Sequence, residues 1–147
     1  MAETLAPVTL DRVSQVLEAS GLKPTPGSGG VTIPLEGSTV VFRVVEEDHK
    51  LLQILGLTKE VQEGNHYVDS WIWFANSWNV DTLWPKAIVL FQGEAPTRTI
   101  QLRGEHTLVY AGGATDTQLS VDVATAVDAM KELFVRYARE STDGSGM

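Results

Sequence analysis

The side chains that most often carry acid–base or metal chemistry are few and scattered in this sequence. It holds three histidines, His49, His66 and His106, and no cysteine. No two histidines stand at a spacing typical of a metal site, and the lack of cysteine excludes thiol nucleophiles, thiolate ligands and disulfides. Two of them, His49 and His106, fall in predicted turns. We therefore expect no metal, no other cofactor and no catalytic histidine.

Other catalytic patterns are also missing from the sequence. The run Glu46-Glu47-Asp48 lies in a predicted turn, where solvent leaves no reason for one carboxyl pKa to shift as catalysis requires. It also lacks the alternating oxygen ligands and central glycine of a calcium loop. There is no Gly-x-Ser-x-Gly sequence and no glycine-rich phosphate loop. The sequence predicts a protein that is not an enzyme, although a Ser–His pair assembled only by folding stays open.

One segment has an unusual composition. Residues 71–79 read Trp-Ile-Trp-Phe-Ala-Asn-Ser-Trp-Asn, so three of the four tryptophans lie within this short stretch. Trp71, Phe74, Ala75 and Trp78 recur at the spacing of one helical face, which predicts an apolar stripe packed on a sheet.

The remaining residues of this segment point to a second face. Each residue of a helix is rotated by about 100° from the one before it, which places Trp73 off the stripe. Trp73 is therefore a candidate anchor for a partner. Asn79, at the predicted helix end, suits a left-handed cap, whereas Asn76 in mid-helix predicts a specific hydrogen bond. Whether the tryptophans of the stripe belong to the core or to an interface stays open. The candidate binding residues are Trp71, Trp73, Asn76, Trp78 and Asn79.

Composition and charge limit the class of protein. The chain of 147 residues is 43% apolar, which suits a single domain over 1–147 with an ordered core at 9–140 and flexible ends at 1–8 and 141–147. Its net charge of −8 repels phosphate backbones, so we expect no nucleic-acid partner. The first residues do not resemble a signal peptide and the apolar runs are too short for a membrane span, so we expect a cytoplasmic protein without a membrane partner.

Apolar periodicity and turn residues predict an α+β domain in the order α-β-β-β-α-β-β-β-α. Short turns between consecutive strands favour an antiparallel sheet, covered by an N-terminal helix, a short central helix and a long C-terminal helix. Pro34 predicts an edge strand. The predicted helices are 10–20, 68–79 and 116–140, the strands are 31–35, 39–45, 50–58, 86–92, 98–103 and 107–110, and the main loop and turn are 23–30 and 104–106.

The same periodicity predicts the core. The side chains expected to be buried are Leu17, Phe42, Val44, Ile88, Leu90, Leu102, Val127, Met130 and Phe134.

The central segment resembles a known family. Phe74-Ala75-Asn76-Ser77-Trp78-Asn79, followed by Trp84-Pro85-Lys86-Ala87, is similar to the central signature of the YbjN family of bacterial proteins, and residues 9–140 follow the course of that family. The resemblance implies a fold similar to type III secretion chaperones, which are small acidic α+β proteins that usually dimerise and bind extended segments of other proteins. It implies another protein as partner, a possible homodimer that includes Trp73, and no catalytic residue.

Three functions remain open at this point. The first expectation is a chaperone-like or regulatory protein-binding module, which needs an exposed apolar patch beside a sheet edge. The alternative is a small-molecule sensor, with Asn76 and Arg43 turned into an apolar cavity. An enzyme comes third, because it requires a cleft with clustered titratable groups.

Overall fold

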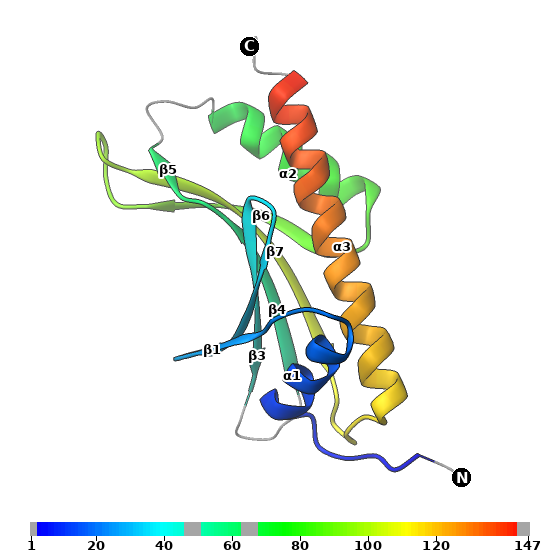
Figure 1. The fold of residues 1–147 in the computed structure, drawn as a ribbon. Helices are drawn as coiled ribbons and strands as arrows, with labels where there is room; N and C mark the ends of the chain where they lie inside the picture. Colours follow the sequence, from blue (N-terminus) through cyan, green and yellow to red (C-terminus); the bar gives the residue numbers. More distant parts are fainter. Residues whose placement is uncertain (1–2, 46–50, 63–67, 144–147) are drawn as a thin grey trace.

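The computed structural model describes residues 3–45, 51–62 and 68–143. Three helices and seven strands lie within these ranges (Figure 1). The helices are α1 (Leu10–Ala19), α2 (Val68–Asp81) and α3 (Asp116–Asp143). The strands are β1 (Thr25–Gly27), β2 (Gly30–Leu35), β3 (Ser38–Val44), β4 (Leu51–Thr58), β5 (Val61–Gln62), β6 (Lys86–Gln92) and β7 (Thr99–Val109).

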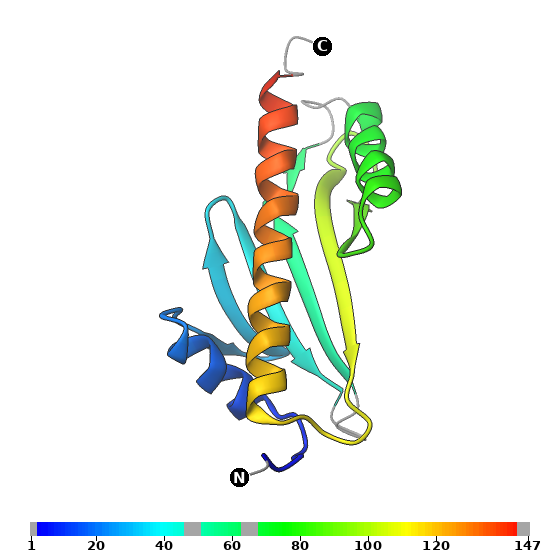
Figure 2. The same cartoon turned by 90° about the vertical axis from the view of Figure 1, so that its right-hand side faces the viewer.

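The strands form one antiparallel sheet, which confirms the predicted fold class. Their order is β1-β2-β3-β4-β7-β5, and β6 pairs with β7 on its other side. The sheet curves strongly, and α3 runs along one of its faces (Figure 1). In Figure 2, α1 lies beside the N-terminal end of α3 and α2 lies beside its C-terminal part. All three helices therefore stand on one face of the sheet. The other face, which we call the open face, carries no helix in the described part of the chain (Figures 1 and 2).

Most of the predicted core is correct. Leu17, Phe42, Leu102, Val127, Met130 and Phe134 are buried between the helices and the sheet. Val44 is only half-buried at the end of β3, although it packs against the core.

The prediction for β6 was wrong by one position. The pairs Ala87↔Gly104 and Val89↔Leu102 belong to the helix-covered side of the sheet, where Ala87 is buried and Val89 packs on the core. Because successive side chains of a strand alternate, Ile88 and Leu90 point to the open face and are half-buried.

The predicted turn at 104–106 is also wrong, because β7 continues through it as a single strand. Gly104 pairs with Gly56 of β4 in the middle of the sheet. A Cβ atom on Gly104 would lie 2.7 Å from the Leu133 side chain, and one on Gly56 would lie 2.7 Å from the Phe134 ring. The two glycines thus allow α3 to approach the sheet closely, which is a tertiary requirement rather than a turn.

The predicted loop at 23–30 contains strand structure. Residues 25–27 form β1, which pairs with residues 30–32 of β2, so the edge in this region is β1 and not the first part of β2. Pro34 lies beyond this pairing, opposite Thr39 of β3. Because β1 does not pair with this part of β2, the N–H group that Pro34 lacks is not needed for a hydrogen bond on that side.

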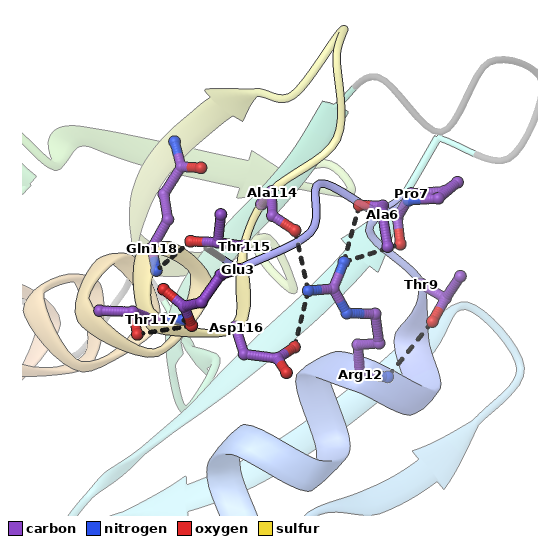
Figure 3. Close-up of polar contacts among 10 residues, drawn as sticks. All are labelled: Glu3, Ala6, Pro7, Thr9, Arg12, Ala114, Thr115, Asp116, Thr117 and Gln118. Atoms are coloured by element: carbon purple, nitrogen blue, oxygen red, sulfur yellow. Dashed lines mark hydrogen bonds and ion pairs between the residues drawn. The ribbon is translucent and has the colours of Figure 1, made fainter. Parts of the chain in front are cut away.

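The segment before α1 makes more contacts than the loose arm that the sequence predicts. Ala6 and Ala114 exchange backbone hydrogen bonds, and the guanidinium of Arg12 donates to both carbonyls and to the Asp116 carboxylate (Figure 3). The Glu3 carboxylate accepts from the backbone N–H and the hydroxyl of Thr117. These bonds satisfy donors in the first turn of α3, where an acidic group is favoured.

Candidate protein-binding surface

One face of α2 is firmly packed. Trp71 and Phe74 make edge-to-face contacts with the Tyr137 ring of α3, at centroid distances of 5.0 and 5.5 Å. Trp78 is 2% exposed; its indole N–H donates to the Pro85 carbonyl at 2.7 Å. The predicted stripe is therefore buried, and its aromatic rings pack on α3 rather than on the sheet alone. Trp71 and Trp78, two of the candidate binding residues, belong to this buried face.

Asn79 connects α2 to the sheet. Its amide oxygen accepts from the Ala87 backbone N–H at 2.8 Å, and its amide nitrogen donates to the Ala87 carbonyl at 2.9 Å. One side chain thus pairs both backbone groups of Ala87 on the side of β6 that faces away from β7. The left-handed cap was the wrong interpretation, because α2 continues to Asp81.

The opposite face of α2 is apolar and exposed. Trp73 is 64% exposed and Val80 is 85% exposed, with Ile72 beside them. Asn76 is exposed on the same side. Its side chain forms no hydrogen bond with another described residue, so the predicted bond is not found within the described ranges. Leu83, just after the helix, is 97% exposed. We call Ile72, Trp73, Asn76, Val80 and Leu83 the outer face of α2.

This surface is also acidic. Asp69 and Asp81 are the charged residues of α2, whose sequence contains no lysine or arginine. Both are exposed, and among the described residues the only ion pair of Asp81 is with the guanidinium of Arg136, at 3.9 Å. An exposed apolar cluster bordered by carboxylates favours a partner with an apolar centre and basic surroundings.

A cluster of titratable groups joins β7 to the N-terminal part of α3, and no pattern in the sequence predicted it. His106 belongs to β7 rather than to a turn, and its ring stacks on Trp84 at 4.4 Å. Burial lowers the pKa of His106 from its ordinary value of 6.5, and the Asp122 charge partly opposes this shift. Asp122 accepts a 2.6 Å hydrogen bond from the Tyr110 hydroxyl. Burial and this bond raise the pKa of Tyr110.

Neither a metal site nor a membrane span emerges from the described ranges. Among residues 3–45, 51–62 and 68–143, no three histidine, aspartate or glutamate side chains gather closely enough to hold a metal ion. Within the same ranges no helix has the length and apolar character needed to cross a bilayer.

The fold defines the class of protein: an α+β domain in which three helices cover one face of a curved antiparallel sheet. The family model described as "Putative bacterial sensory transduction regulator", YbjN, matches residues 9–136. The chain therefore belongs to the YbjN family, as the resemblance of its central segment indicated.

A solved structure supports the same fold. The chain is similar to the crystal structure of YbjN from E. coli, described as a putative transcription regulator, with a TM-score of 0.72 and 13% sequence identity. The match covers 94% of this chain and 97% of the other. No curated protein matches the sequence significantly.

Proposed function

We propose that this protein is a non-enzymatic regulatory module that acts in the cytoplasm by binding another protein through the outer face of α2. The observation that carries the proposal is the exposure of Trp73, Val80 and Leu83 on a helix whose other face is fully packed. A helix that is apolar on both sides is normally covered on both sides.

The properties of this surface favour a protein partner. Tryptophan is among the residues that contribute most to protein–protein binding, and here it stands in an apolar cluster with a carboxylate border. The description of the family as regulators is compatible with this role. Because the chain has a net charge of −8, it is more suited to regulation through protein contacts than to direct binding to DNA.

The first partner to test is a second copy of the chain. A two-fold axis places the same surface on both subunits, so one exposed tryptophan contributes twice to the interface. The chaperone-like fold implied by the family resemblance also favours a homodimer. Nothing in this mode of action requires a cofactor.

The small-molecule alternative receives less support. It required Arg43 and Asn76 to face a common cavity, but both are exposed, and they lie on β3 and α2 respectively. Ligand sites instead need polar groups that converge in a concave, mostly apolar pocket.

Sedimentation equilibrium tests the proposal. We expect the wild type to be a dimer at micromolar concentration, Trp73→Ala to be a monomer with an unchanged circular dichroism spectrum, and the control Val135→Ala to remain a dimer. Val135 is a suitable control because it is an apolar residue of α3 that is 57% exposed and does not belong to the outer face of α2. A wild-type monomer at high micromolar concentration removes the homodimer. Equal association of all three proteins removes the role of Trp73.

A further inference from the structure

The open face of the sheet is more apolar than a solvated face should be. In an antiparallel sheet with one covered face, the uncovered positions are usually polar. Here three strands, β3, β4 and β6, contribute large aliphatic side chains at positions that alternate with the core residues, and β7 lies between β4 and β6. These residues are Val41, Leu55, Leu57, Ile88 and Leu90.

The register brings these side chains together. Val41 stands opposite Leu55, and Leu57 and Ile88 stand on either side of Arg103. Leu55 is 5% exposed, although it lies on the face that carries no helix in the described part of the chain. The apolar residues therefore form one continuous floor around Arg103.

The charge of the open face opposes that of the whole chain. Of the charged side chains at its strand positions, Arg43, Lys86 and Arg103 are basic and Glu105 is acidic. The face thus carries a surplus of two positive charges in a chain whose net charge is −8. An acidic partner is electrostatically favoured there and disfavoured over most of the remaining surface.

Arg103 also retains hydrogen-bonding capacity. One terminal nitrogen contacts the Glu105 carboxylate at 2.9 Å. Its Nε atom is buried and has no hydrogen-bond partner in the described structure. A partner's carboxylate cannot reach this buried atom, but the Arg103 side chain is 25% exposed, so its positive charge can still attract an acidic group.

The outer face of α2 has the complementary chemistry. It combines an apolar centre, Ile72, Trp73 and Val80, with the carboxylates of Asp69 and Asp81. The 14 residues of α2 extend over about 21 Å. Across the sheet, the four strands β3, β4, β7 and β6 of the open face span about 14 Å. Along β7, side chains on one face recur every second residue, and three such intervals span about 20 Å. The helix thus fits the length of the face.

We propose that the outer face of α2 docks on the open face of the sheet of a second copy, and that a two-fold axis repeats the contact. This inference rests on the proposed function, because it identifies what α2 binds. The carboxylates of Asp69 and Asp81 meet the basic groups of Arg43, Lys86 and Arg103, and Trp73 covers the aliphatic floor. Pairing α2 with α2 would instead place carboxylates against carboxylates and leave the floor uncovered.

Charge exchange between the two faces tests the contact. Arg43→Glu with Lys86→Glu, and Asp69→Lys with Asp81→Lys, should each weaken the dimer by about tenfold or more, because like charges then face each other. The protein with all four substitutions has the wild-type net charge and should recover most of the affinity. The control Lys131→Glu with Arg139→Glu alters exposed residues of α3 and should leave association unchanged. All sites are exposed, so folding is checked by thermal melting.

Cross-linking locates the contact directly. The chain has no cysteine, so single cysteines can be introduced without background. A mixture of Val80→Cys and Ile88→Cys proteins should form mixed dimers with a short bismaleimide, whereas a mixture of Val121→Cys and Ile88→Cys should not.

Two results would overturn the inference while the proposed function stands. In the first, Trp73→Ala abolishes the dimer but neither charge-reversed pair weakens it. In the second, Val80→Cys cross-links to itself and not to Ile88→Cys. A wild-type monomer would overturn both the inference and the homodimer on which it rests.

Discussion

The two faces of α2 use the same kinds of residue for different purposes. On the inner face, Trp71 and Trp78 contact rings and backbone groups of α3 and of the segment before β6. On the outer face, Trp73 and Val80 have similar apolar character but contact solvent. Composition therefore does not distinguish a core tryptophan from a candidate binding tryptophan. The distinction comes from helical phase, because only one side of α2 faces the rest of the domain.

The largest expected effect lies on the inner face. Trp78→Ala should lower the free energy of unfolding by about 3–5 kcal/mol, because it removes a buried indole and its hydrogen bond to the Pro85 carbonyl. It also removes the ring under the Arg136 guanidinium, which lies 5.0 Å from its centroid. Guanidinium titration of the two proteins measures this loss. A loss below about 1 kcal/mol would mean that the inner face does not stabilise the fold as its burial indicates.

A matched pair of asparagines gives a smaller contrast. Asn79→Ala should cost about 1 kcal/mol, since the two hydrogen bonds to Ala87 are lost. Asn76→Ala should change the stability by less than about 0.5 kcal/mol. Both changes bring the same gain in helix propensity, so their difference in thermal or chemical denaturation isolates the two bonds. Equal effects would show that the contact with β6 contributes nothing measurable.

The titratable cluster of His106, Tyr110 and Asp122 predicts a pH dependence. The pKa of His106 is lowered in the folded protein, so the unfolded chain binds more protons once the pH falls below about 6.5. Stability is then lost as the pH falls from about 6.5 through the lowered pKa. His106→Gln should reduce this loss in melting curves recorded between pH 8 and pH 5.5. If the wild type and His106→Gln lose the same stability between pH 8 and pH 5.5, the role of His106 in the pH dependence is contradicted.

The sequence predicted the fold class and the phase of α2 because both depend on strong local periodicity. The helical spacing of Trp71, Phe74 and Trp78 indicates the buried side, and the exposure of Trp73 follows from the same period. Which side chains of β6 face the core was harder to predict, because the run from Ala87 to Phe91 is apolar throughout and shows no alternation. Only pairing with β7 decides which of its side chains face α2.

The remaining misses have tertiary causes. Gly104 gives a turn signal in sequence, whereas its role is to let Leu133 and Met130 pack against the middle of β7. Asn79 gives a cap signal, but its partner Ala87 lies in a strand whose position the local sequence does not specify. Similarly, the stacking of His106 on Trp84 brings together two residues that lie far apart in the sequence.

The smallest expected effect on intrinsic stability, that of Trp73→Ala, tests the central claim that the outer face of α2 serves association. The direct measurement is guanidinium unfolding at several protein concentrations, because a dimer is stabilised by mass action and a monomer is not. We predict that the wild-type midpoint rises with protein concentration. The Trp73→Ala midpoint should stay constant and agree with that of the wild type at the lowest concentration. A Trp73→Ala midpoint lowered equally at all concentrations would contradict the account, since Trp73 would then be an ordinary part of the core.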